Sequence, residues 1–86
     1  MSTYSVVLPT VGRPSLTDVL TDLHRQSGPA PQEVIVVDDR PLVDTADLEL
    51  PDGAVPVRVL RSGGRGPAAA RNAGWRTAAT EWVAFL

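Results

Sequence analysis

Apolar side chains recur with two different periods along this chain. Residues 4–9 and 33–37 are short runs rich in Val, Ile and Leu, and continuous runs of this kind are typical of strands in a parallel sheet that is covered on both faces. Residues 15–27 instead repeat apolar side chains at helical spacing, after a serine that can cap the helix. The complete pattern predicts strands over 4–9, 33–37, 56–61 and 81–86, helices over 15–27 and 67–79, and a long loop over 38–55.

This order of elements predicts an α/β fold. The elements follow one another as strand, helix, strand, loop, strand, helix and strand. This succession gives a Rossmann-like, three-layer parallel sheet with right-handed crossovers, which forms one small domain or part of one over residues 1–86. Ligands of such sheets bind beyond the carboxyl ends of the strands. The segments expected at that edge are residues 9–13, 38–40 and 61–66.

Composition narrows the chemistry that this sheet edge can perform. The 86 residues include no Cys and no Lys, and His24 is the only histidine. A disulfide framework, a thiolate or multi-histidine zinc site, a Walker-type phosphate loop and a lysine Schiff base are therefore excluded within this sequence. The formal net charge of -2 argues against general binding of nucleic acid. No apolar run reaches the ~20 residues that cross a bilayer and the N-terminus does not resemble a signal peptide, so we expect a cytoplasmic protein and leave membrane association open.

Positive charge is concentrated in the second half of the chain. Between the long loop and the last predicted strand there are five arginines and no acidic residue, and a glycine-rich turn at 62–66 leads into the second helix. Glycine lets backbone amides approach an anion, the helix start adds free amides, and arginine forks match phosphate oxygens. We therefore predict an anion site that uses Arg65 and Arg71, and we interpret Arg58 and Arg76 as solvated surface charges.

Asp38 and Asp39 follow the most apolar of the predicted strands. Carboxylates there can bind a metal, accept from a base or ribose, or cap the loop that follows, and the pair by itself does not separate these roles. Residues 64–69 match the G-x-G-x-x-A dinucleotide fingerprint, but they follow the third strand rather than the first, and Pro67 removes an amide that would face a pyrophosphate. The match therefore gives only weak support for a dinucleotide site.

Three residues near the end of the sequence are predicted to pack closely. Gly74 interrupts the second helix, where glycine costs about 1 kcal/mol relative to alanine, and so predicts close contact between that helix and the sheet. Trp75 and Trp82 are interpreted as packing residues because of their large apolar surface.

Four motifs together resemble one family over nearly the whole chain. They are Val6-Val7-Leu8-Pro9-Thr10, Glu33 to Asp39 (E-V-I-V-V-D-D), Gly64 to Gly74 (G-R-G-P-A-A-A-R-N-A-G) and Trp82 to Leu86 (W-V-A-F-L). In order and spacing they are similar to the N-terminal motifs of the family 2 inverting glycosyltransferases, which have the GT-A fold. The pairing of V-V-D-D with G-x-G-x-x-x-A-R-N-x-G is far more specific than either motif alone. The resemblance implies a partial GT-A fold and the transfer of a sugar, with inversion, from a nucleotide-diphospho-sugar to an acceptor that the sequence does not identify.

The resemblance also implies which residues contact the donor. In the family, the residues after the first strand line the nucleotide base, and the second Asp after the second strand binds the uracil or ribose. The arginine of A-R-N lies along the nucleotide pocket, and the glycine-rich turn passes close to it. The resemblance and the location at the carboxyl edge of the sheet together predict the residues that bind the donor. These cofactor-binding residues are Pro9, Thr10, Val11, Arg13, Asp39, Gly64, Arg65, Gly66 and Arg71. Arg13 is included because it can reach a phosphate.

Three departures from the family pattern affect this prediction. Val11 and Gly12 stand where an aromatic-Asn pair is common, which removes base stacking, and Arg40-Pro41 replaces Gly-Ser and should stiffen that loop. The D-x-D metal motif is expected just after Leu86, and the catalytic base further on. We therefore expect no catalytic or metal-binding residue within this sequence. We interpret it as the donor-binding part of a longer enzyme that needs a divalent cation, Mn or Mg, and as inactive by itself.

Three other functions remain open from the sequence. One of them, a nucleotidyltransferase of related sheet topology, lacks its usual glycine-rich, lysine-containing loop after the first strand. A non-catalytic nucleotide-binding or regulatory module can use the same sheet, although a phospho-receiver would need a Lys that is absent. A dinucleotide-dependent oxidoreductase would depend on residues 64–69. For the transferase, the predicted partners are the nucleotide-sugar donor and a glycan, lipid or small-molecule acceptor, and no nucleic acid.

Overall fold

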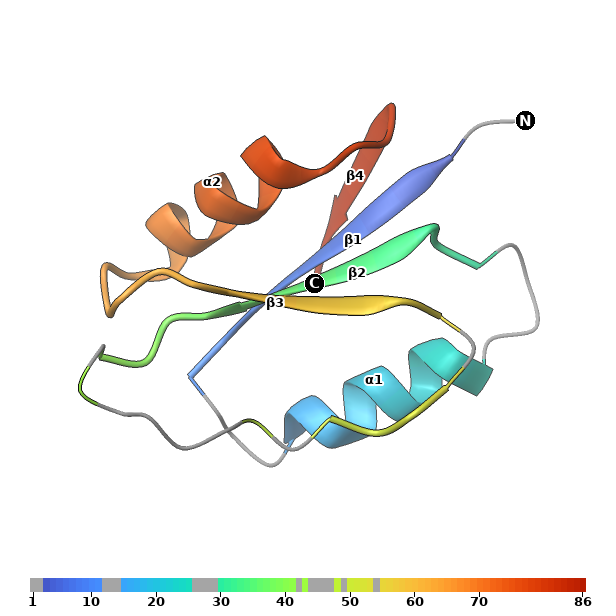
Figure 1. The fold of residues 1–86 in the computed structure, drawn as a ribbon, viewed down its shortest axis with the longest axis horizontal. Helices are drawn as coiled ribbons and strands as arrows, with labels where there is room; N and C mark the ends of the chain where they lie inside the picture. Colours follow the sequence, from blue (N-terminus) through green and yellow to red (C-terminus); the bar gives the residue numbers. More distant parts are fainter. Residues whose placement is uncertain are drawn as a thin grey trace.

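A parallel sheet with one helix on each face forms the protein (Figure 1). The computed structural model describes residues 3–11, 15–25, 30–41, 43, 48, 50–53 and 55–86. The elements, in chain order, are β1 (Tyr4–Thr10), α1 (Ser15–Arg25), β2 (Glu33–Asp38), β3 (Val57–Arg61), α2 (Pro67–Thr77) and β4 (Trp82–Phe85). The α/β fold and the order of elements predicted from the sequence are confirmed, with ends that differ by one or two residues. Between β2 and β3, no described residue belongs to a helix or strand.

The strands lie in the order β3-β2-β1-β4, and every neighbouring pair is parallel. Val7 pairs with Ile35 of β2 on one side and with Phe85 of β4 on the other, so β1 and β2 are the central strands. The chain moves outward from β1 through β2 to β3, and α2 then carries it across to the opposite side of β1. Figure 1 shows α1 and α2 on opposite faces of the sheet.

Alternate residues of the central strands form two separate cores. Toward α1, the buried side chains are Val6, Leu8, Val34 and Val36, with Leu16 and Leu20 of the helix and Val55 of the loop. Toward α2, they are Val7, Ile35 and Val37, with Ala70 of that helix. Because successive strand residues face opposite sides, a strand covered on both faces needs apolar residues at every position. The two cores therefore explain why residues 6–8 of β1 and 34–37 of β2 are unbroken apolar runs.

Pro9, the last residue of the predicted first strand, lies inside the observed one. It pairs with Val37 in the middle of the sheet, and β1 continues to Thr10. The carbonyl of Val7 accepts from the Leu86 amide on the β4 side, and residues two apart in a strand point to the same neighbour. The nitrogen of Pro9, which carries no hydrogen, therefore faces the side of β4, and that strand has already ended at Phe85. Proline is tolerated there because no ladder bond is lost.

Trp75 and Trp82 are not packed in the core, and the prediction that they are packing residues is wrong. Their exposed fractions are 56% and 59%. Trp82 belongs to β4, an edge strand of the sheet, and Trp75 of α2 lines a pocket together with it. Gly74, by contrast, is buried against the sheet, as its place in the helix predicts.

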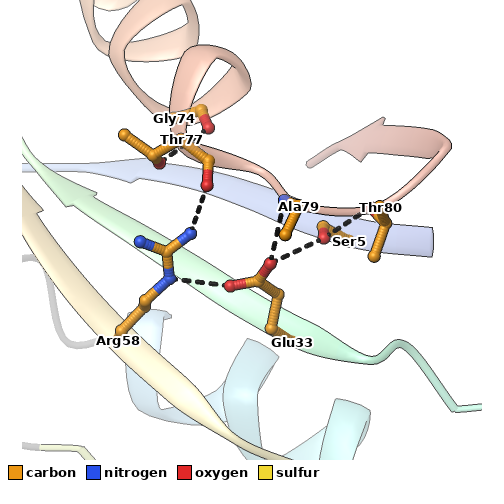
Figure 2. A network of polar contacts seen from close by, with 7 residues as sticks. All are labelled: Ser5, Glu33, Arg58, Gly74, Thr77, Ala79 and Thr80. Carbon is orange, nitrogen blue, oxygen red and sulfur yellow. Dashed lines mark hydrogen bonds and ion pairs between the residues drawn. The ribbon is translucent and has the colours of Figure 1, made fainter.

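A polar cluster joins the first residues of the strands to the connection between α2 and β4 (Figure 2). The Nε of Arg58 donates to Glu33 Oε1 at 2.7 Å, and its Nη2 donates to the carbonyl of Thr77 at 2.6 Å. The hydroxyl of Ser5, which is fully buried, donates to Glu33 Oε2 at 3.1 Å and lies 2.7 Å from Thr80 Oγ1. Arg58 is therefore an ion-paired residue, not the solvated surface charge that the sequence predicts. The hydrogen bond from Arg58 is the main cause that lowers the pKa of Glu33, against the opposing effect of burial.

Candidate functional site

A cavity lies between the carboxyl ends of β1 and β4, where the strand order reverses. β2 and β3 follow on one side of β1, whereas α2 brings β4 to the other side (Figure 1). Parallel α/β sheets bind ligands in the crevice at such a switch point. The cavity has a volume of about 410 Å³. It is lined by Leu8, Pro9, Thr10, Val11, Leu16, Val19, Asp39, Pro67, Ala70, Arg71 and Leu86.

The structure brings most of the predicted site residues to this cavity or next to it. Five of them line it, namely Pro9, Thr10, Val11, Asp39 and Arg71. Gly64 and Gly66 are absent from the lining but belong to the turn whose amides hydrogen-bond to Asp39. Arg65 also donates its amide to Asp39, yet it lines a different pocket. Arg13 lies outside the described residues.

Asp39 holds the glycine-rich turn against the carboxyl end of β1. Its Oδ1 accepts from the Ser62 hydroxyl at 2.6 Å and from the Arg65 amide at 3.0 Å, and its Oδ2 accepts from the Gly66 amide at 2.9 Å. The amide of Asp39 donates in turn to the carbonyl of Thr10 at 2.8 Å. The hydrogen bond from Ser62, supported by those of the turn amides, holds the pKa of Asp39 below its usual range.

These hydrogen bonds change the anion site that the sequence predicts. From the sequence, the amides of the glycine-rich turn were expected to bind an external anion. In the structure, the amides of Arg65 and Gly66 bind the carboxylate of Asp39 instead. Pro67 has no amide to add. The anion at the start of α2 is thus one of the protein's own side chains, which accepts from the two amides just before the helix.

Positive backbone φ angles explain the glycines of the turn. Gly63, Gly64 and Gly66 have φ of 72°, 76° and 100°, in the left-handed region that favours glycine. A Cβ on Gly64 would lie 3.7 Å from the nearest atoms of Asp39 and Pro41, which is an ordinary contact. The conformation of the backbone, and not lack of space, therefore requires glycine at position 64.

Asp38 has a different role from its neighbour. Its Oδ1 accepts from the amide and Nε of Arg40 at 3.1 and 2.9 Å, its Oδ2 accepts from Arg40 Nη2 at 2.8 Å, and Arg61 Nε lies 3.6 Å from Oδ2. The side-chain bond from Arg40 is the main cause that lowers the pKa of Asp38, although the residue is buried. Asp38 therefore caps the loop after β2, which is one of the three roles that the sequence left open. It does not line the cavity.

Acidification is expected to destabilise this fold. The pKa values of Glu33, Asp38 and Asp39 are all lowered from ordinary values of 4.5, 3.8 and 3.8. The unfolded chain then binds protons more readily than the folded one. The stability that these groups contribute is therefore complete above the ordinary values, and it is lost as the pH falls below them and through the lowered pKa values of the folded state. Thermal unfolding followed from about pH 7 to about pH 3 should show a Tm that declines below about pH 5.

Two matched substitutions test the contribution of Glu33 to this decline. Glu33→Gln should make the fall in Tm shallower, because glutamine does not ionise and still accepts from Arg58. Glu81→Gln changes an exposed glutamate and should leave the slope unchanged. The same slope in the wild type and in Glu33→Gln would contradict a stabilising role for the ionised Glu33.

Arg71 brings positive charge to a lining that is otherwise largely apolar. It lies in the second turn of α2, and no described residue forms a hydrogen bond or ion pair with its exposed side chain. Leu8, Val11, Leu16 and Val19 supply apolar surface to the same cavity. Apolar walls with a few polar groups are the usual composition of a site for a small organic ligand. This combination suits a ligand with a flat ring and an anionic group.

The sequence analysis missed the contributions of the two helices and of Ser62. Leu16 and Val19 of α1 were counted only in the apolar pattern that predicts the helix, although the start of the helix after β1 lies at the same sheet edge. Ala70 of α2 lines the cavity as well. Ser62 follows β3 directly, and a hydroxyl at that position was a signal for a partner of Asp39.

The described residues assemble no group of three or more His, Asp or Glu that could hold a metal ion. Asp38 and Asp39 are the acidic pair nearest to the cavity, but their carboxylates are bound to arginine side chains and to turn amides, respectively. They therefore do not form a ligand set for a divalent cation.

Comparison with known proteins identifies one family. Residues 5–86 match the model of the family described as Glycosyl transferase family 2. The matched range includes both helices, three complete strands and all of β1 except Tyr4. No curated protein and no solved structure gives a significant match to the chain. Across the described residues, neither helix is long and apolar enough to cross a membrane.

Proposed function

The chain belongs to glycosyl transferase family 2, and on this premise we propose that the cavity between β1 and β4 binds the nucleoside of a nucleotide-diphospho-sugar donor. One observation carries the proposal. A cavity of about 410 Å³ at the switch point brings together the segment Pro9 to Val11, Asp39 and Arg71, which are far apart in the sequence. The sugar of this donor is then transferred to an acceptor with inversion.

Each part of the cavity wall suits one part of such a donor. Val11, Leu16 and Val19 offer apolar surface to the face of a base. Val11, which is 53% exposed, provides a smaller contact there than the aromatic residue common in the family. Arg71 offers a planar fork of donors to oxygens of the ribose or diphosphate. Asp39 keeps the glycine-rich turn in place beside them.

A divalent cation and a general base complete the proposed reaction, but neither is assigned to a described residue. Family 2 enzymes generally use nucleotide sugars and often use a divalent metal. When bound, such a cation neutralises charge on the leaving diphosphate, and a base takes the proton of the acceptor hydroxyl. The cytoplasmic location and the inverting course stay predictions.

Substituting Arg71 with lysine tests the proposed site. Arg71→Lys keeps the charge but removes the fork, so the dissociation constant of UDP or another nucleoside diphosphate should rise about tenfold. Isothermal titration calorimetry measures the effect. Arg76→Lys is the matched control, because Arg76 lies in the last turn of the same helix and does not line the cavity. Full affinity in Arg71→Lys would leave Arg71 a structural residue.

The dinucleotide-dependent alternative has less support from the geometry. Its fingerprint would need the amides around residues 64–69 to face a pyrophosphate, and those of Arg65 and Gly66 bind Asp39 instead. Thermal stabilisation by ligands separates the two functions, since a ligand that binds the folded state raises Tm. Stabilisation by NAD and by no nucleoside diphosphate would replace the transferase proposal.

A further inference from the structure

A second pocket beside the glycine-rich turn carries positive charge that the proposed donor site does not use. It has a volume of about 460 Å³ and is lined by Arg61, Ser62, Gly63, Arg65, Ala69 and Ala73. None of these residues lines the cavity between β1 and β4, and none is acidic. We propose that this pocket, called the Arg61–Arg65 pocket, binds a phosphate group of a soluble phosphate ester or of a lipid headgroup.

Arg65 is held at its backbone while its side chain stays available. The amide of Arg65 donates to Asp39 Oδ1 at 3.0 Å, which sets where the side chain leaves the main chain. Among the described residues, none forms a hydrogen bond or ion pair with the exposed guanidinium. A fixed backbone reduces the ordering needed when a ligand binds, and a guanidinium that no described residue pairs keeps its charge for that ligand.

Arg61 presents a second guanidinium that is already oriented. Its Nη2 donates to the carbonyl of Pro41 at 3.0 Å, and its Nε lies 3.6 Å from Asp38 Oδ2. These contacts hold the side chain at the end of β3 and occupy only part of its five N–H donors. Asp38 is already paired at 2.8 Å with Arg40, so the charge of Arg61 is only partly compensated by that carboxylate.

The shape of the pocket favours phosphate over a smaller, singly charged anion. Ala69 and Ala73 lie four residues apart on α2, and their small side chains leave room between the helix and the two arginines. Two guanidinium forks match several oxygens at once, as a phosphate group offers. A carboxylate, with one charge and two oxygens, would satisfy one fork only.

Titration of inorganic pyrophosphate into the whole chain, without divalent cations, tests this inference. We expect binding that weakens as salt is added, because both arginines are reached from solvent. Arg65→Ala keeps the amide that binds Asp39, so the turn stays intact, and should weaken binding by about tenfold or more. Arg76→Ala removes the same charge from α2 outside the pocket and should change the affinity by less than about twofold.

Three results would overturn the proposal, and the first is the absence of pyrophosphate binding. Equal weakening by Arg65→Ala and Arg76→Ala would show that net charge alone explains the affinity. Dependence on Arg71 rather than Arg65 would place the anion in the cavity between β1 and β4. The donor proposal is tested separately, because loss of nucleoside diphosphate binding does not affect pyrophosphate held by Arg65.

Vesicles distinguish the two sources of the phosphate group. Phosphatidylcholine vesicles that contain phosphatidate present a phosphomonoester at their surface, and phosphatidylcholine alone is the control. Flotation of the chain with phosphatidate that is lost in Arg65→Ala assigns a lipid headgroup. Pyrophosphate binding that depends on Arg65, without flotation, assigns a soluble ester. If neither probe responds to Arg65→Ala, the Arg61–Arg65 pocket is not a phosphate site.

Discussion

Gly74→Val is expected to lower the free energy of unfolding by about 3 kcal/mol. Gly74 is buried in α2, and a Cβ built on it would lie 3.0 Å from Val37 Cγ2 and closer still to Val7 Cγ1. Both valines are fully buried in the central strands. A β-branched side chain has little rotamer freedom in a helix, so α2 must move away from the sheet to accept it. Since 86 residues correspond to a stability of only about 4 to 13 kcal/mol, this loss is large.

Urea denaturation of three variants measures the effect and its cause. Ala68→Val places the same side chain at an exposed position of α2 and should cost only about 0.5 kcal/mol, from helix propensity. Gly74→Ala separates propensity from packing, because alanine favours an isolated helix by about 1 kcal/mol over glycine. A more stable Gly74→Ala protein would contradict the close approach of α2 to Val7.

Asp39→Ala is expected to raise the dissociation constant of a nucleoside diphosphate by about ten- to a hundredfold. The change removes the acceptor shared by Ser62, Arg65 and Gly66 and leaves these donors without a partner. Gly66 precedes α2 directly, so release of the turn also frees the start of the helix that carries Arg71. The cavity then loses the carboxylate of Asp39 from its wall, and Arg71 is no longer held in one position. Calorimetric titration with UDP measures this loss.

Three further variants make the result of Asp39→Ala interpretable. Asp39→Asn keeps the size of the side chain but turns an NH₂ group toward amide donors, so it should bind the nucleotide almost as poorly. Ser62→Ala removes one donor and keeps the carboxylate, which preserves the test if Asp39→Ala fails to fold. Asp52→Ala removes an exposed acid and should bind as the wild type does. An unchanged dissociation constant in folded Asp39→Ala would remove Asp39 from the site.

The residues that the sequence analysis placed correctly share a local signal. Val34 to Val37 form an unbroken apolar run. Such a run predicts a strand that is covered on both faces of the sheet, whichever strands pair with it. Gly74 interrupts a helical pattern, which signals close approach whatever the partner is. The continuation of β1 past Pro9 was not predicted, because the effect of proline depends on which neighbouring strand its nitrogen faces. That direction is set by the pairing of β1 with β4, whose paired residues lie 78 positions apart in the sequence.

By itself, the sequence determined the helices, the strands and their parallel arrangement, because hydrophobic period, glycine and proline act on neighbouring residues. It also pointed to the sheet edge, since the carboxyl ends of parallel strands meet there. The tertiary structure alone decided that Asp39 binds the turn amides, and that Arg65 and Arg71 line different pockets. It likewise paired Arg58 with Glu33. These outcomes depend on strand register and on the face that α2 turns toward the sheet, which bring together groups far apart in the chain and which no local pattern encodes.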